Sequence, residues 1–200
     1  MFASFAFSIF EESIVEYHIK DDVYQVFVNK YEKGGIENLL YAKNWVDTVQ
    51  WHYEDIVRDP QINPVDALDL KRKIDASNQV RTDMVEYIDS YFLDKYKDIT
   101  PKHNAKINTE TIAWSIDRLS ILALKIYHMK IEANRNEATE THRENCTQKL
   151  NVLLEQKKDM FMSIDQLIED IENGDKIIKV YKQMKMYNDQ DLNPVLYQSK

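Results

Sequence analysis

Turn-forming residues are scarce in this chain, since its 200 residues include only three glycines and four prolines. A fold with many tight turns needs both, because glycine supplies positive φ angles and proline presets the turn backbone. Long helices with few connections need little of either. Hydrophobic residues make up 44% and charged residues 30%, which suits a buried core under a solvated surface. The sequence therefore predicts an all-α protein, a multi-helix bundle without a sheet.

Residue spacing predicts where the first helices lie. Two helical stretches are expected within residues 2–32, and the glycine pair at 34–35 ends that region. Apolar residues then recur at spacings of three and four across residues 39–57, which puts them on one helical face. A helix is predicted from about Glu37 to just before Pro60, with this apolar face toward the core.

The clearest predicted helix start lies at Asn63. Asparagine is a favoured N-cap, Pro64 suits the first helical position, and Asp66 follows in the first turn. An apolar stripe continues from there to about Tyr96. A third and longer helix is therefore predicted over residues 64–96.

Residues 109–132 form the most apolar segment, with hydrophobic side chains on nearly every side of a predicted helix. A helix that is apolar all round belongs inside a protein, because any side facing water would expose hydrophobic surface. We therefore expect this helix to lie at the centre of the bundle and to be its most buried element.

The last third of the chain changes character. Residues 133–149 are polar throughout, which indicates a mobile connection or a solvated helix. A near-heptad apolar stripe follows over residues 150–171, and a last helix is expected over residues 177–187, so the two predict a C-terminal helical hairpin. The chain is thus divided into a helical core domain, residues 1–138, and a hairpin, residues 139–200, that packs on this domain or mediates self-association.

Charge and cysteine content narrow the classes of partner. The formal net charge is −8, and the 26 Lys and Arg residues are interleaved with acids, so nucleic-acid binding is not expected. The apolar opening, residues 1–10, is far too short to span a bilayer. Cys146 is the single cysteine, so an internal disulfide is excluded and a cytoplasmic location is expected for this acidic protein.

One candidate pocket wall comes from the stretch WHYEDIVRDP, residues 51–60. Trp51 lies roughly 160° or more from the apolar stripe of its helix, so a second surface must cover it. That surface is either a neighbouring helix or a pocket that Trp45 and Trp51 wall. His52 lies one turn before Asp55, so the two could form an imidazole–carboxylate pair or supply two metal ligands.

Arg81 is the strongest anomaly in the third predicted helix, because it and Ser77 interrupt an otherwise apolar stripe. A buried guanidinium needs a carboxylate or a ligand, since an unpaired charge in a core is severely unfavourable. Lys71 and Asn78 lie at the margin of the same stripe. Asp117, on the next predicted helix, is the candidate partner of Arg81.

Acidic and basic side chains of three neighbouring helices are therefore expected to converge. The candidate polar or ligand-binding cluster comprises His52, Asp55, Lys71, Asp75, Asn78, Arg81, Asp117 and Arg118. The cluster is either an internal ion-pair network that fixes helix register or a site for an anionic ligand. In a site, its basic members would neutralise phosphate and its acidic members would handle a proton or a metal.

Familiar catalytic and metal-binding motifs are missing from the sequence. It has no Glu-x-x-His pair of the kind used by di-iron bundles, no phosphate-binding glycine loop and no Gly-x-Ser-x-Gly turn. Acid pairs at helical spacing, such as Asp66 with Asp69, are more typical of a solvated face. No metal site is therefore predicted, and cofactor and catalytic residues are left unassigned.

Three segments together resemble one bacterial protein family. They are WHYEDIVRDP, KRKIDASNQVRTDMVEYIDSYF and ETIAWSIDRLSILALKIYHM, within roughly residues 40–132. Their combination is similar to domain-of-unknown-function family 4254, in the form found in Bacteroides-type bacteria. The resemblance implies a helical fold and a bacterial source, and it brings no established activity. It also points to a protein partner in envelope-glycan assembly.

Two functions fit these observations. The first is a helical binding or accessory protein, linked to envelope-glycan assembly, that holds a small anionic ligand in the polar cluster. The second is an enzyme acting on a phosphate-bearing small molecule, such as a nucleotide or sugar nucleotide, with or without a metal. The incomplete catalytic set favours the first. A protein partner or a homodimer is expected beside the small ligand.

Overall fold

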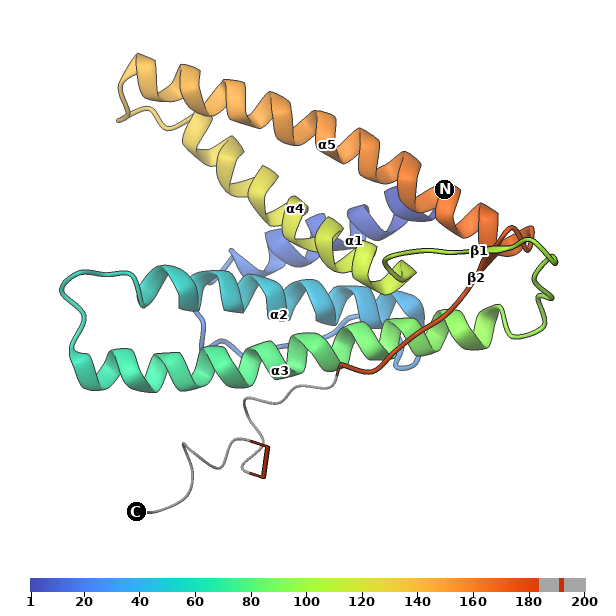
Figure 1. Ribbon diagram of the computed structural model, residues 1–200. Coiled ribbons are helices and arrows are strands. Elements are labelled where there is room, and N and C mark those ends of the chain that lie inside the picture. Colours follow the sequence, from blue (N-terminus) through green and yellow to red (C-terminus); the bar gives the residue numbers. More distant parts are fainter. Residues whose placement is uncertain (184–190, 193–200) are drawn as a thin grey trace.

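Five α-helices build the protein in the computed structural model, which describes residues 1–183 and 191–192 (Figure 1). In chain order they are α1 (Phe2–Tyr17), α2 (Ile36–Ile56), α3 (Pro64–Lys95), α4 (Ile112–Ala133) and α5 (Glu140–Glu172). The all-α prediction is therefore confirmed. None of these helices combines the length and apolar character that crossing a membrane requires.

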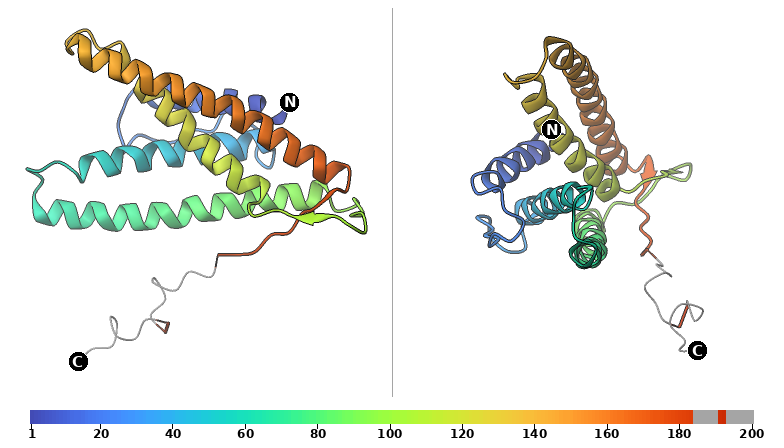
Figure 2. Two further views of the ribbon diagram at one scale, coloured as in Figure 1. Left: turned by 45° about the horizontal axis from the view of Figure 1, so that its top comes forward. Right: turned by 90° about the vertical axis from the view of Figure 1, so that its left-hand side faces the viewer.

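The helices pack as two pairs with α1 beside them (Figure 1, Figure 2). Helices α2 and α3 lie antiparallel, and α4 and α5 form a C-terminal pair. Helix α4 contacts all four other helices, so the central position predicted for residues 109–132 is confirmed. The larger buried share belongs to α1, with 8 of 16 residues against 9 of 22 in α4, because the end of α4, residues 127–133, contains no buried residue. The expectation that the central helix is also the most buried is wrong.

Local capping explains where two of the helices begin. The side-chain oxygen of Asn63 accepts a hydrogen bond from the backbone N–H of Val65 at 2.8 Å, and Pro64 is the first residue of α3. The hydroxyl of Thr111 accepts from the N–H of Trp114 at 3.2 Å and so caps α4. The predicted helix start at Asn63 is therefore confirmed.

A single helix, α1, lies within residues 2–32, where two helical stretches were predicted. The connection to α2 is irregular and held by side-chain amides. Asn29 donates to the backbone carbonyl of Asn38 at 2.9 Å, and Asn38 donates to the carbonyl of Tyr31 at 2.9 Å. These bonds satisfy backbone groups without helix formation, so the prediction of a second stretch is wrong.

The face of α2 that contacts the core differs from the predicted one. The apolar residues at its predicted core positions, among them Val46 and Val49, are only partly buried, and Ile56 is 44% exposed. Lys43 and Asp47 are buried instead. The spacing of apolar residues predicted the wrong core-facing side because Lys43 and Asp47 have charged and hydrogen-bonding partners on neighbouring helices, and these partners offset the cost of burying them.

The C-terminal hairpin is built differently from the prediction. Residues 140–149 begin α5 as a largely solvated helix, which was one of the two alternatives for the polar segment 133–149. The hairpin therefore consists of α4 and α5. The helix predicted over residues 177–187 is absent across residues 177–183, and positions 184–187 lie outside the described residues.

A short parallel strand pair closes one end of the bundle, although no sheet was predicted. It joins β1 (Lys106–Ile107) to β2 (Lys176–Ile177). Gly174, at a φ of +73°, turns the chain after α5, and its carbonyl accepts from the N–H of Lys102 at 2.8 Å. This turn carries the chain back along the loop before α4, because glycine adopts positive φ without strain.

The apolar stripe of α5 faces the core. Ile164 and Ile171 are buried, and Leu150 and Leu153 pack against the core with partial exposure. Helices α1 and α4 both contact α5 and cover this stripe. The surface that suggested self-association is therefore used within the chain. Self-association stays a prediction. The division of the chain into a core domain, residues 1–138, and a hairpin, residues 139–200, also stays a prediction.

Asp89 on α3 anchors the start of α4. Its carboxylate accepts from the hydroxyl of Thr111 at 2.9 Å and from the N–H of Ala113 at 3.4 Å. Burial raises the pKa of Asp89 to about 6, although these two hydrogen bonds act in the lowering direction. The pKa in the unfolded chain is lower, about 3.9. Protonation of Asp89 therefore favours folding, fully below about pH 4, and this contribution is lost as the pH rises through about 6.

We expect the Asp89→Asn variant to lack this pH-dependent contribution to the free energy of unfolding. Urea unfolding between about pH 4 and pH 7 should show the wild type gaining about 2–3 kcal/mol relative to the variant as the pH falls. Asp94→Asn is the matched control, because Asp94 lies on the same helix with its side chain 78% exposed. Parallel pH profiles for the wild type and Asp89→Asn would show that Asp89 carries no such linkage.

Candidate functional site

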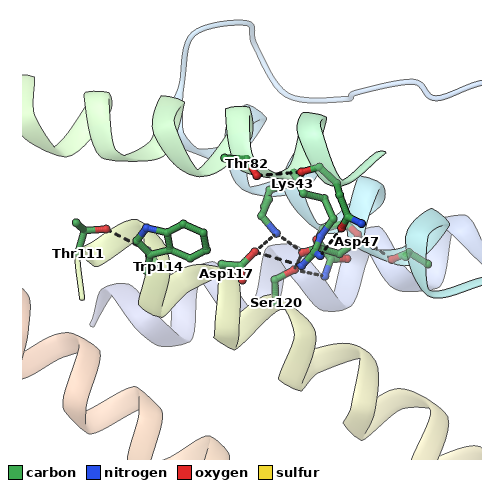
Figure 3. Close-up of polar contacts among 11 residues, drawn as sticks. Lys43, Asp47, Thr82, Thr111, Trp114, Asp117 and Ser120 are labelled. Atoms are coloured by element: carbon green, nitrogen blue, oxygen red, sulfur yellow. Dashed lines mark hydrogen bonds and ion pairs between the residues drawn. The ribbon is translucent and has the colours of Figure 1, made fainter. Parts of the chain in front are cut away.

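A charged cluster lies buried between α2, α3 and α4 (Figure 3). Lys43 and Asp47, one turn apart on α2, are 0% and 1% exposed. The ammonium of Lys43 pairs with Asp47 and also, at 2.7 Å, with the carboxylate of Asp117 on α4. Ser120, one turn after Asp117, donates its hydroxyl to Asp47 at 2.6 Å. Two carboxylates from different helices thus share one buried ammonium.

Arg81 of α3 joins the cluster from its more exposed side. Its Nε donates to Asp47 at 2.6 Å, and its Nη2 donates to Asp117 at 3.4 Å. Its Nη1 donates to Asn78, one turn back on α3, at 3.4 Å. Burial alone would lower the pKa of Arg81, but the charge and hydrogen bond of Asp47, with the charge of Asp117, raise it. The guanidinium therefore stays charged and is fixed in orientation.

The two cations and two anions of this cluster balance. Each carboxylate is shared by Lys43 and Arg81, so every member has two oppositely charged partners. Such a network offsets much of the cost of dehydration, whereas removal of one member leaves a buried charge with too few partners. Because its members come from three helices, the network also fixes how α2, α3 and α4 are aligned.

A polar cavity of about 420 Å³ opens beside the charged cluster. It is lined by Asp47, Gln50, Trp51, Glu54, Asp55, Arg58, Asn78, Arg81 and Ile121. Arg81 and Asn78 also line a second cavity, of about 200 Å³, together with Thr82 and Trp114. Gln50 is 7% exposed, and its buried Oε1 accepts no hydrogen bond from the described residues. The cavity is thus lined mainly by charged and polar side chains, with one unsatisfied acceptor buried in its wall.

Four of the predicted site residues lie together. Arg81 contacts both Asn78 and Asp117, and Asp55 lines the same cavity as Arg81. Asp117 is a partner of Arg81, as predicted from the sequence, but Asp47 makes the shorter hydrogen bond. The acceptor that a buried Arg81 requires is therefore mainly a residue of α2.

Three other predicted residues lie outside the cluster. Lys71 and Asp75 pair with each other on α3, with side chains 57% and 46% exposed. Arg118 has a side chain 64% exposed and pairs with Glu110. The cause is helix geometry, because one residue step turns a side chain by about 100°, which carries Arg118 away from the face of its neighbour Asp117.

The two tryptophans have different surroundings. Trp45 is 6% exposed and packs in the core against Tyr17, with ring centroids 5.4 Å apart. Trp51 lines the polar cavity and stacks on His128 with ring centroids 4.9 Å apart and 6° between the planes. Of the two residues predicted as pocket walls, Trp51 therefore borders this cavity and Trp45 packs in the core.

His52 belongs to a separate cluster with two other histidines. His18 directly follows α1, and His128 lies on α4. One ring nitrogen of each histidine lies within 4.8 Å of the others. Burial lowers the pKa of His52, against the charge of Asp21. Burial, with the charges of His18 and His52, lowers the pKa of His128 to about 4. At neutral pH, His52 and His128 are therefore uncharged imidazoles.

Several important residues of these clusters were missed by sequence reasoning. Lys43 and Asp47 have the spacing of an ordinary exposed helix pair, the same as Lys71 and Asp75, so spacing alone gives no signal of burial. His18 lies in a part of the sequence to which no chemistry was assigned. The one available signal was Arg81, whose predicted burial required an acceptor on a neighbouring helix.

The comparisons with known proteins agree with the resemblance seen in the sequence. A family model described as "Protein of unknown function (DUF4254)" matches residues 37–180. A search of the curated proteins and a search of the solved structures gave no match. The matched segment contains the charged cluster and every residue that lines the polar cavity, whereas α1 and His18 precede it. Since the match covers well over half of its length, the chain belongs to the DUF4254 family.

Proposed function

We propose that this protein binds a small phosphate-bearing molecule, of the sugar-nucleotide class, in the polar cavity between α2, α3 and α4. Arg81 is the observation that carries the proposal. Two carboxylates, of Asp47 and Asp117, hold its Nε and Nη2, its Nη1 makes only a long contact to Asn78, and its side chain lines the cavity. A planar guanidinium fixed in this way is preorganised to pair with a phosphate oxygen.

Other side chains of the cavity supply further contacts for such a ligand. Arg58, whose side chain is 65% exposed, lines the same cavity and adds a second positive charge. Trp51 offers an aromatic surface for a base or a sugar ring.

The charge of the lining argues for a ligand with hydroxyl groups over a bare anion. Glu54 and Asp55 place two carboxylates around the cavity beside the buried carboxylate of Asp47, against the two guanidinium groups of Arg58 and Arg81. Carboxylates accept hydrogen bonds from hydroxyl and amide donors, which the sugar and base of a nucleotide carry. A phosphate ester with several hydroxyl groups satisfies both sets of side chains.

The same proposal includes the biological setting. We place the protein in the cytoplasm of a Bacteroides-type bacterium, as an accessory protein of envelope-glycan assembly that works with a protein partner or a second copy of itself. The support for this setting is the resemblance of the three sequence segments, the single cysteine and the acidic net charge.

An enzyme acting on the same class of ligand is the second candidate. Asp55 favours it, because this exposed carboxylate lines the same cavity as Arg81 and could take a proton from a ligand hydroxyl. Chromatography of sugar nucleotides incubated with the purified protein separates the two candidates. Turnover that Asp55→Asn abolishes supports the enzyme, and unchanged ligand supports the binding protein.

A thermal-shift screen over uridine and guanosine diphosphate sugars tests binding, because a ligand that binds only the folded state raises its Tm. For a sugar nucleotide found in this way, Arg81→Met should abolish the shift. Arg58→Met should weaken binding about tenfold or more, since a hydrogen bond to a charged group contributes roughly 1.5–3 kcal/mol. This second variant leaves the buried cluster intact, so its effect is separate from folding.

Arg72→Met is the matched control for both substitutions. Arg72 lies on α3 with its side chain 70% exposed and does not line the cavity, so its loss should leave the shift unchanged. If no member of the panel raises the Tm of the wild type, or if Arg58→Met and Arg81→Met bind as the wild type does, the proposal is wrong. The charged cluster is then an internal ion-pair network alone.

A further inference from the structure

Three imidazole rings from separate parts of the fold meet in one cluster. His18 follows α1, His52 lies on α2 and His128 lies on α4. One ring nitrogen of each lies within 4.8 Å of the others. The side chains of His18 and His52 are 11% and 19% exposed, so the group is largely shielded and still reachable from solvent.

Hydrogen bonding determines which ring nitrogens carry lone pairs. Nδ1 of His18 donates to the carbonyl oxygen of Ile14 at 2.6 Å, which fixes the proton on Nδ1 because a carbonyl only accepts. Nε2 of His18 is then a lone-pair nitrogen and accepts a hydrogen bond from Nε2 of His52 at 3.2 Å, so a metal bound to Nε2 of His52 requires the proton of that ring to move to Nδ1. Nε2 of His128 is buried without a hydrogen-bond partner among the described residues. A buried nitrogen without a partner is uncommon in folded proteins, and an ion or an ordered water can satisfy it.

We propose that His18, His52 and His128 bind one divalent transition-metal ion, of the zinc class. Nitrogen ligands about 2.0–2.1 Å from a tetrahedral ion lie about 3.3 Å from one another. The distance of 3.2 Å between the ring nitrogens of His18 and His52 already matches this value. Imidazole nitrogens suit zinc, copper and nickel, whereas magnesium and calcium prefer oxygen ligands. Three protein ligands leave the fourth position for water.

The surroundings of the three rings fit a bound cation. Tyr17 stacks on His52 with ring centroids 5.1 Å apart and Trp51 stacks on His128, so both rings are held in place. The carboxylate of Asp21 lies 3.6 Å from Nε2 of His52. Asp21 has a φ of +51°, a left-handed conformation that aspartate adopts more readily than most residues. The turn after α1 thus places a negative charge next to the proposed ligands.

Titration of the full chain with cobalt(II), prepared without a histidine tag, tests this site. Cobalt(II) reports tetrahedral nitrogen coordination through its visible absorption, and zinc should displace it at one ion per chain. His52→Gln and His128→Gln should each weaken cobalt binding by about 100-fold. Each variant removes a proposed metal ligand, which should cost at least as much as the loss of a residue that only orients a ligand. His103→Gln is the matched control, because His103 is exposed and outside the cluster, and should bind as the wild type does.

A measurement on the wild type avoids any dependence on variant folding. Long-range ¹H–¹⁵N spectra of the histidine rings should show zinc-induced shifts for His18, His52 and His128, with His103 and His142 unchanged. The proposal is overturned if the wild type binds neither cobalt nor zinc at one ion per chain. It is equally overturned if zinc shifts only the rings of His103 or His142, or if His52→Gln and His128→Gln retain full affinity. None of these outcomes depends on ligand binding at Arg81.

Discussion

Replacement of Lys43 by methionine is expected to lower the free energy of unfolding by about 3–5 kcal/mol, the typical cost of breaking a fully buried ion pair. Methionine keeps much of the apolar volume but removes the charge that Asp47 and Asp117 share. Arg81 then faces two carboxylates alone, and the cluster buries a net negative charge. Urea unfolding, followed by helical circular dichroism, measures the loss.

The chain contains a matched control for this substitution. Lys71 and Asp75 form a lysine–aspartate pair with the same spacing on α3, but their side chains are 57% and 46% exposed. Lys71→Met should therefore change stability by about 1 kcal/mol or less. The contrast isolates burial, because residue types and spacing are the same in both pairs.

A second substitution tests whether charge imbalance is the cause. In the Lys43→Met background, Asp117→Asn removes the surplus negative charge and should recover part of the lost stability. Equal losses in the free energy of unfolding for Lys43→Met and Lys71→Met would contradict the buried cluster. A double variant whose loss exceeds the sum of the losses of the two single variants would contradict it as well.

The Phe10→Ala variant should also lose about 3–5 kcal/mol, because it leaves a cavity in a packed core. Phe10 is 0% exposed on α1, the helix that contacts α2, α4 and α5. Helix α1 precedes the segment that the family model matches, residues 37–180. The expected loss would show that α1 is an integral part of the same core.

Phe5→Ala is the control for Phe10→Ala on the same helix. Phe5 is 39% exposed, so removal of its ring should cost about 1 kcal/mol or less. The midpoint of urea unfolding measures both variants. A Phe10→Ala variant as stable as Phe5→Ala would mean that α1 contributes little to the fold.

The sequence determined which segments form most of the helices, because the responsible interactions are local. The N-cap at Asn63 with Pro64, and the apolar character of residues 109–132, act within a few turns of one helix. These signals gave the start of α3, the central place of α4 and the all-α class. They failed for residues 177–183, because Gly174 turns the chain toward the loop before α4, Ile177 pairs with β1 and residues 178–183 are irregular.

The buried side of α2 and the composition of both polar clusters were decided by the tertiary structure. Lys43 with Asp47 and Lys71 with Asp75 look alike in the sequence, and only the partners on α3 and α4 make the first pair a buried one. His18, His52 and His128 are likewise far apart along the chain and meet through helix packing. Burial of a charge or of a lone pair depends on groups from other helices. The free energy that selects these arrangements therefore arises only when the helices pack together.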